Sequence, residues 1–228
     1  GHNIMKTLKA ITLSLVMMFG LSSAAYSIEG LGIGVSGNYN GFYAVGEEIP
    51  SNNVGNKDRK EAGAFLETTV SVFVEYDAGP VSIGVDYFPG DVSTPENTNI
   101  QHTSDSDSTN LTNTVQADFK DLISLYAILP LPIEALEGAY LKAGLREATV
   151  ETNENLGTGG SYGDVEVQGW TAGLGYQVDG ENGMSFRLEA TATQWDDVTS
   201  TNDADTSTKV KITDMMSASA TVSILKTF

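Results

Sequence analysis

The sequence predicts an all-β protein built as an eight-stranded antiparallel up-and-down transmembrane β-barrel. Eight segments alternate apolar residues with small or polar ones at a period of two, the pattern of a strand with two different faces. The connections between these segments alternate between long and short, as in barrels with long outer loops and short periplasmic turns. Beyond the N-terminal leader, no apolar stretch approaches the ~20 residues that a spanning helix needs. A membrane location therefore requires a closed barrel.

The N-terminus has the features of an export signal. Met5, Lys6 and Lys9 form a basic start, and residues 10–21 form an apolar run that is too short to cross a bilayer. Small residues follow at 22–27, so we expect cleavage after Ala25 or Ser27. The predicted division is a removed segment at 1–27, which includes the residues before Met5, and an outer-membrane β-barrel at 28–228.

The charge and the lack of cysteine exclude several classes of protein. The formal net charge is −18, and removing residues 1–27 takes it to −20 because Lys6 and Lys9 are the only charges there. So acidic a chain repels phosphate, so we expect no nucleic-acid partner. Without cysteine there is neither a disulfide framework nor a thiolate metal site.

The first three predicted strands cover 31–45, 64–76 and 81–88, and their alternation is regular. Their apolar face carries Leu31, Ile33, Val35, Leu66, Val70, Val72, Val74, Ile83 and Val85. Their opposite face carries Gly32, Gly34, Ser36, Asn38, Glu67, Thr69, Ser71, Phe73, Glu75, Ser82, Gly84 and Asp86. Placing the apolar face toward lipid makes the second set the lining of the barrel.

The fourth predicted strand, 115–129, has two competing phases. One phase places Phe119, Asp121, Ile123, Leu125, Ala127 and Leu129 on the lipid face, and the other places Leu122, Ser124, Tyr126 and Ile128 there. We favour the first phase, with Asp121 near the outer rim. A β-bulge would reconcile the two phases.

The last four predicted strands cover 139–150, 165–178, 184–195 and 209–228. Their apolar positions include Leu141, Leu145, Trp170, Leu174, Phe186, Leu188, Met216, Val222 and Ile224. Glycine, serine, threonine and charged residues occupy the alternate positions. Short connections at 77–80, 130–138 and 179–183 alternate with long polar ones at 46–63, 89–114, 151–164 and 196–208. An even strand count places both ends of the barrel chain on the short-turn side.

The last strand resembles the closing strand of bacterial outer-membrane barrels. Alternating apolar residues lead to Phe228, and Lys226 is the one departure from the pattern. The mature chain as a whole is similar in pattern to small barrels of the OmpA-transmembrane, OmpX and OmpW kind. This resemblance implies that Phe228 is an assembly signal for the barrel-assembly machinery. It also implies a location in the bacterial outer membrane, with membrane lipid and lipopolysaccharide as partners and a monomeric state. The alternative is a soluble up-and-down barrel or lipocalin, which would place the apolar residues inside.

Charged residues on the predicted inner face form a balanced set. The predicted lumen charges are Glu67, Glu75, Asp86, Lys120, Lys142, Arg146, Arg187 and Glu189. Because an unpaired charge in a narrow interior is costly, we expect pairing across the lumen. Our hypothesis is that Arg146 and Arg187 bridge to inward glutamates as a plug. A purely structural role and a selectivity constriction for small solutes remain the two interpretations of this set.

Other motifs indicate neither catalysis nor a cofactor. The Gly32, Gly34 and Gly37 spacing matches a dinucleotide fingerprint, but the strand pattern continues through it and no helix follows. His102 is the only histidine after residue 27 and lies in a polar loop, so no nucleophile–base pair is indicated. The acidic run from Asp105 lacks the glycine and glutamate of a calcium loop, so we expect no dedicated metal site. Weak cation binding by the acidic loops at the outer rim, bridging lipopolysaccharide phosphates, is the alternative.

These observations favour a non-enzymatic barrel with a structural or surface-contact role in the cell envelope. The alternative function is a narrow porin that passes small solutes or ions. An eight-stranded barrel has an interior barely wide enough to be filled by side chains, which disfavours general diffusion. However, the small lining residues could leave a path for water.

Overall fold

The computed structural model describes residues 28–49, 59–102, 110–156, 160–204, 206–207 and 209–228. The predicted leader, 1–27, lies outside the described residues. The elements are β1 (Leu31–Ile49), β2 (Arg59–Asp77), β3 (Ser82–Tyr87), β4 (Val92–Ser93), β5 (Asn97–His102), β6 (Asn110–Pro130), η2 (Glu134–Leu136), β7 (Ala139–Leu156), β8 (Val165–Asp179), η3 (Glu181–Gly183), β9 (Met184–Trp195), β10 (Val198–Thr201) and β11 (Lys209–Thr227).

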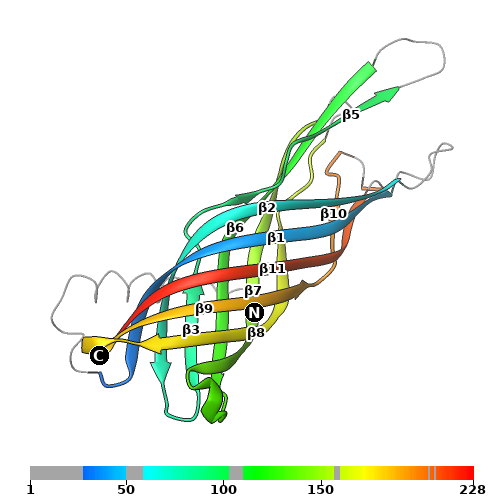
Figure 1. The fold of residues 1–228 in the computed structure, drawn as a ribbon. Helices are drawn as coiled ribbons and strands as arrows, with labels where there is room; N and C mark the ends of the chain where they lie inside the picture. The colour runs from blue at the N-terminus through cyan, green and yellow to red at the C-terminus, as the bar shows by residue number, and fades with distance from the viewer. Residues whose placement is uncertain (1–27, 50–58, 103–109, 157–159, 205, 208) are drawn as a thin grey trace.

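Eight of these strands close into an antiparallel ring, which confirms the predicted fold class. Neighbouring strands pair in the order β1, β2, β3, β6, β7, β8, β9, β11, and β11 pairs back onto β1 over most of its length. The short strands β4 and β5 pair with β6, and β10 pairs with β11. Figure 1 shows the tilted strands of this barrel and the strand ends that continue beyond it.

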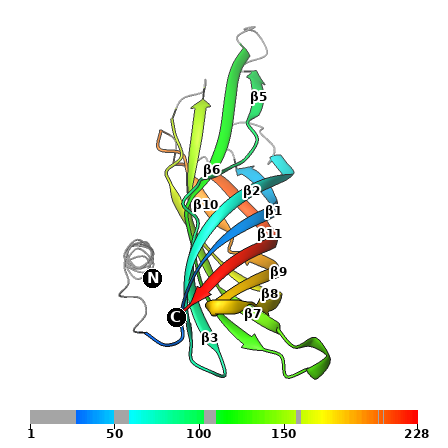
Figure 2. The ribbon, with the colours of Figure 1, turned by 60° about the vertical axis from the view of Figure 1, so that its left-hand side comes forward.

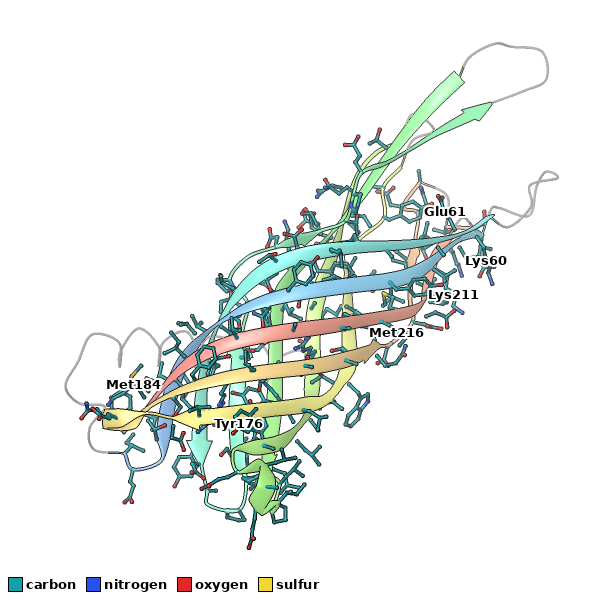
Figure 3. The ribbon with its side chains drawn as sticks, in the orientation of Figure 1. Lys60, Glu61, Tyr176, Met184, Lys211 and Met216 are labelled. Carbon is teal, nitrogen blue, oxygen red and sulfur yellow. The ribbon has the colours of Figure 1, made fainter. Side chains whose placement is uncertain are left out.

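The side chains of the ring are distributed with apolar residues outside and polar residues inside. Trp170, Leu66 and Val35 are 69%, 64% and 56% exposed on the outer wall, whereas Ser71 and Ser124 are buried in the interior. Figure 3 shows the outer wall of the barrel with its side chains, among them Tyr176 and Met216. A soluble barrel would have the reverse arrangement, because water favours polar exteriors. The chain is therefore an outer-membrane-type β-barrel whose exterior meets lipid.

Within the part of the chain that the structure describes, no helix is long and apolar enough to span a bilayer.

Strand β6 contains the irregularity that made its phase ambiguous. The pairing with β7 shifts register between Lys120 and Ile123, and Asp121 adopts a left-handed φ of 57°. Leu125, Ala127 and Leu129 follow the favoured phase and face outward. Phe119 does not, because the bulge turns it inward, where its ring stacks on the Phe42 ring at 5.9 Å. The predicted lipid-facing position of Phe119 is therefore wrong.

Several strands are longer than the sequence pattern predicted. β1 and β2 extend to Ile49 and Arg59, and β6 and β5 form a hairpin within the segment predicted as loop 89–114. Figures 1 and 2 show that these extensions lie at the end of the barrel opposite the short turns. They form an outer crown of paired strands. The C-terminal residue lies at the short-turn end, where the Gly30 amide donates to the Phe228 carbonyl.

Candidate functional site: the barrel lumen

A charged bridge crosses the lumen between β2 and β9, which are separated in the ring by β1 and β11. The Arg187 guanidinium donates from Nη1 and Nη2 to the two Glu75 carboxylate oxygens at 2.8 and 2.6 Å. Arg187 Nε also donates to Gln177 Oε1 at 2.6 Å. Both charged side chains are nearly inaccessible, with 6% and 5% exposed. This bidentate geometry is the strongest form of a carboxylate–guanidinium pair.

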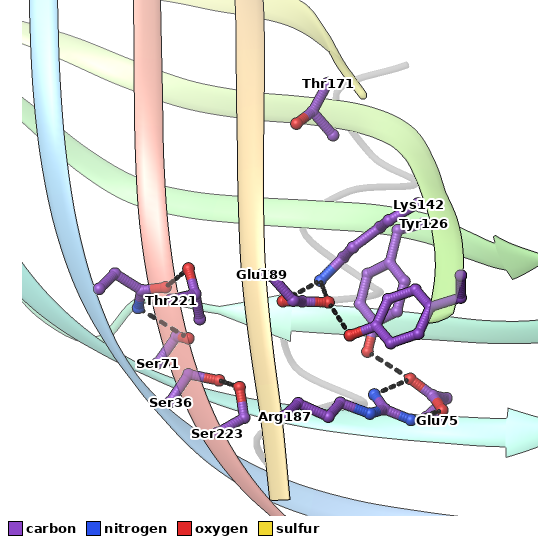
Figure 4. Close-up of polar contacts among 12 residues, drawn as sticks. Ser36, Ser71, Glu75, Tyr126, Lys142, Thr171, Arg187, Glu189, Thr221 and Ser223 are labelled. Atoms are coloured by element: carbon purple, nitrogen blue, oxygen red, sulfur yellow. Dashed lines mark hydrogen bonds and ion pairs between the residues drawn. The ribbon is translucent and has the colours of Figure 1, made fainter. Parts of the chain in front are cut away.

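A second ion pair lies beside the first and joins β7 to β9. Lys142 Nζ lies 3.1 Å from both Glu189 carboxylate oxygens, and the Tyr140 hydroxyl donates to Glu189 Oε1 at 2.8 Å. The Tyr126 hydroxyl donates to Glu75 at 3.0 Å. Lys142 also lies 4.0 Å above the Tyr126 ring, so this ring links the two pairs. Figure 4 shows the two pairs and Tyr126 side by side within the barrel. We call these groups the ionic layer.

Two glycines make room for the tyrosines of the ionic layer. A Cβ on Gly84 would lie 2.4 Å from the Tyr126 ring, and a Cβ on Gly175 would lie 2.1 Å from the Tyr140 ring. Such distances are far below van der Waals contact, so each ring lies directly on glycine backbone. The small lining of β3 and β8 is therefore filled by aromatic rings from neighbouring strands.

Amide and hydroxyl groups complete the polar lining on the side of β1, β2 and β11. Asn38 donates to Ser71 at 3.3 Å and accepts from the Thr221 hydroxyl at 2.7 Å. Asn40 makes the corresponding bonds with Thr69 and Ser219. These ladders pair the buried amide and hydroxyl groups of this part of the lining.

An apolar layer fills the lumen on the side of the outer crown. It is a cluster of buried side chains from six strands and the segments next to them. Its members are Phe88, Leu122, Ala148, Val150, Val167, Trp195, Val198 and Met215. The Trp195 indole N–H donates to Ser217 at 3.0 Å, so its one polar group is paired. Phe42 stacks on Phe65 at 4.9 Å and packs near the same layer through Phe119.

Asp86, Ser124 and Arg146 lie next to one another across β3, β6 and β7. All three are more than nine-tenths buried, and Asp86 Oδ1, Ser124 Oγ and Arg146 Nε have no hydrogen-bond partner among the described residues. Arg146 lies 5.7 Å from the Phe88 ring. The predicted bridge from Arg146 to a glutamate is not formed in this part of the chain. Lys142 pairs with Glu189 instead, because Glu189 is level with Tyr140 across β8, which places Lys142 two residues and Arg146 six residues away along β7.

The remaining predicted site residues lie apart from the ionic layer. Glu67 has the inward phase on β2 but is half-buried nearer the outer crown. The bulge in β6 turns the Lys120 side chain outward, where its Nζ lies 2.5 Å from a Glu151 carboxylate oxygen. The predicted place of Lys120 in the lumen is therefore wrong. The Phe228 ring lies 5.7 Å from Lys226 Nζ, next to η3. Its predicted role as an assembly signal stays a prediction.

Sequence reasoning placed Phe73 on the inner face but did not recognise that aromatic side chains fill the lumen. Tyr126, Tyr140, Phe73 and Trp195 are all more than nine-tenths buried inside the barrel. The sequence carried a signal for this, because each of these aromatic residues alternates in step with the glycine, serine or charged residues of its strand and not with the apolar ones. Large aromatics at such positions indicate a filled interior.

Two cavities border the filled region. One of about 780 Å³ opens at the short-turn end and is lined by Glu75, Tyr140 and Arg187 together with residues of the turns. The other is an apolar cavity of about 70 Å³ next to the apolar layer, lined mainly by Val150, Val165, Val198, Val210 and Ile212. The large cavity thus reaches the ionic layer from the periplasmic side.

One acidic loop contains a local hydrogen-bonded contact between Asp203 and Ser161. Asp203 accepts hydrogen bonds from the Ser161 amide at 2.6 Å and the Ser161 hydroxyl at 2.9 Å. These bonds hold the pKa of the Asp203 carboxyl below its usual range. Among residues 28–49, 59–102, 110–156 and the later described ranges, no three carboxylate or histidine side chains gather as a metal site. The acidic run from Asp105 lies outside the described residues.

Comparisons with known proteins identify no family and give only low structural similarity. No family model and no curated protein matches the sequence. Among solved structures, the outer membrane protein OprG from Pseudomonas aeruginosa is 10% identical over 88% of this chain and 97% of its own, with a TM-score of 0.49. The outer membrane protease OmpT from Escherichia coli is 10% identical over 87% and 96%, with a TM-score of 0.46. Neisserial surface protein A is 11% identical over 84% and 97%, with a TM-score of 0.38. Similarities this low transfer no activity to this chain.

Proposed function

We propose that this protein is a plugged, non-enzymatic outer-membrane barrel with a structural or surface-contact role in the cell envelope. The observation that carries the proposal is the ionic layer, in which Arg187–Glu75 and Lys142–Glu189 join strands that are not neighbours in the ring. Six buried charges on the inner wall, three acids and three bases, are balanced in a chain of net charge −18. Such balance favours a closed interior over a charge-selective pore.

The apolar layer supports the same conclusion independently. A path for hydrated solutes would have to cross both the ionic layer and the cluster around Trp195 and Leu122, and the second has almost no polar surface to offer. The outer crown extends the barrel with paired strands instead of a wide vestibule. This arrangement supports a role in which the barrel anchors a rigid surface outside the membrane.

A narrow porin is the competing function, and solute flux separates the two. Proteoliposomes containing the refolded chain are diluted into isotonic arabinose, and their swelling is compared with that of protein-free liposomes. We expect equal swelling, with insertion confirmed by flotation and by the β-sheet circular dichroism spectrum. Faster swelling in proportion to protein content would overturn the plugged barrel and support the porin.

The absence of catalysis is tested separately. We expect the refolded protein to leave a fluorogenic peptide library and phospholipid vesicles uncleaved at neutral pH. Turnover that is removed by substituting a single described carboxylate would refute the non-enzymatic proposal.

A further inference from the structure

The outer half of β2 has one edge that no described strand covers. On one side, β2 pairs with β1 from Arg59 to Tyr76. On the other side it pairs with β3 only from Val72 to Asp77. Within the described residues, nothing pairs with this second edge between positions 59 and 71. The barrel wall therefore has an open seam at its outer end.

The seam begins where a proline interrupts the pairing. Val72 lies opposite Tyr87, so continuing this register would place Val70 opposite Pro89, which has no amide to donate. The Phe88 amide instead donates to the Leu122 carbonyl at 3.0 Å, and the chain follows β6 through β4 and β5. Figures 1 and 2 both show β5 and the outer part of β6 leaving the direction of β2.

The phase of β2 identifies the amides that face the seam. The Asp77 amide donates to Gly30 beside β1, whereas the Ala78 amide donates to Val81 on the β3 side. Because backbone groups alternate sides along a strand, even-numbered residues direct N–H and C=O toward the seam. In agreement, the odd-numbered Glu67 and Thr69 carbonyls accept from asparagines on β1. The residues with backbone groups in the seam are Lys60, Ala62, Ala64, Leu66, Thr68 and Val70.

The seam crosses from lipid into water. A tilted strand needs about ten residues to cross an apolar band ~25 Å tall. Counted from Tyr76, an exposed aromatic near the short-turn end, this band ends near Leu66. Acyl chains cannot bond the backbone groups of Leu66 to Val70, and open sheet edges do not persist in hydrocarbon. The edge therefore calls for a partner that supplies backbone hydrogen bonds.

A second copy of this chain cannot be that partner through the same edge. If the β2 edges of two copies paired with each other, the two strands would run antiparallel and would be related by a twofold axis normal to the barrel wall. Such an axis lies in the membrane plane and inverts one copy, whereas copies inserted from the same side share one orientation. The partner strand must come from another protein.

We propose that the β2 edge from Lys60 to Val70 binds an extended strand of a partner protein, antiparallel to β2. Its apolar side chains would lie beside Ala62, Ala64 and Leu66 on the outer face. Its inward side chains would be basic, because the half-buried Glu67 carboxylate has no ion pair within the described residues and the chain as a whole is acidic. Main-chain bonds supply affinity in this mode and alternate side chains supply specificity. The inference rests on the proposed surface-contact role and names its partner class.

The free edge is tested first by amide hydrogen exchange, measured by NMR on the full chain in zwitterionic nanodiscs. Ala62 and Ala64 lie above the apolar band, as do their odd-numbered neighbours Gly63 and Phe65. We expect the even-numbered amides to exchange at least tenfold faster than the odd-numbered ones. Equal protection of both sets would show that the chain covers its own edge, which overturns the proposal.

Binding is tested with a synthetic peptide of about nine residues that alternates valine with lysine and threonine. We expect it to slow exchange at Ala62 and Ala64 and to bind in a fluorescence anisotropy titration. Ala64→Pro removes one seam amide and no bond to β1, so we expect at least a tenfold loss of affinity. Ala64→Val keeps the amide and serves as the matched control, with affinity unchanged.

Three results would contradict a strand-docking edge. They are no peptide binding, binding that Ala64→Pro leaves unchanged, and protection of the edge by lipopolysaccharide without peptide, which would make lipid its cover. Each of these can occur with a plugged or a conducting barrel, so failure here and failure of the proposed function are distinguishable through the swelling assay.

Discussion

Removing Arg187 provides the sharpest energetic test of the ionic layer. In Arg187→Met, Glu75 loses both charged hydrogen bonds and keeps the one from the Tyr126 hydroxyl, while its carboxylate stays 5% exposed. Leaving one member of a buried pair uncompensated costs about 3–5 kcal/mol. Replacing both members by apolar side chains removes the uncompensated charge, so Glu75→Met with Arg187→Met should cost far less than the sum of the single changes.

The assay is urea unfolding of the refolded protein in lipid vesicles, followed by tryptophan fluorescence for the wild type, both single variants and the double variant. We expect a coupling free energy of roughly 2–3 kcal/mol from the four unfolding curves. Lys60→Met provides the control, because its pair with Glu47 is 63% exposed on the lysine side and should contribute about 0–1 kcal/mol. Additive single costs for Glu75 and Arg187 would refute the reasoning.

Two further predictions concern packing and pH. Gly175→Ala should lower the free energy of unfolding by about 1–3 kcal/mol, because the added Cβ displaces the Tyr140 ring. Gly37→Ala is the control and should cost little, since its added Cβ meets its nearest neighbour at an ordinary 3.8 Å. Urea unfolding compares the two variants, and equal costs would contradict the contact between Gly175 and the ring. Asp203 has a folded pKa below its ordinary value of 3.8, so its hydrogen bonds with Ser161 are fully formed above pH 3.8 and are lost as pH falls through the lower folded pKa. The NMR shift of the Ser161 amide should therefore titrate below pH 3.8. Titration above pH 3.8 would contradict these hydrogen bonds.

The ring of the barrel could be predicted from parity because lipid and lumen impose opposite demands on alternate residues. Val35, Leu66 and Leu174 face lipid, while Ser71 and Glu75 face the lumen, as their alternation indicates. The inner and outer residues of each strand then followed from which alternate positions are apolar. The closure of β11 onto β1 follows from eight strands of this kind, since a free edge is not tolerated in hydrocarbon.

The outer crown could not be predicted in the same way. In water, both faces of a strand pair can be polar, so residues 46–49 and 59–63 show no period although they pair as strands. The same holds for β5, which pairs with β6 inside a segment whose composition suggested a loop. Strand formation in the outer crown depends on pairing with a neighbouring strand and not on burial of one face. Such pairing imposes no recognisable residue pattern on the sequence.

The pairing partners inside the lumen were also beyond the sequence pattern. Parity placed Arg146 and Lys142 on the same inner face, but it could not decide which reaches Glu189. The bulge at Asp121 adds one residue to β6 and reverses the faces of Phe119 and Lys120. An aspartate can adopt the left-handed conformation of such a bulge, but its presence in the sequence does not predict a bulge.

Single-channel conductance of the refolded chain in planar bilayers tests the plugged lumen most directly. We expect no discrete current steps from the wild type, with insertion confirmed independently. We expect steps to appear only when both layers are opened, as in Arg187→Ala combined with Trp195→Ala. Reproducible steps from the wild type at neutral pH would contradict the plugged barrel, because they require a continuous water path past the Glu75–Arg187 pair.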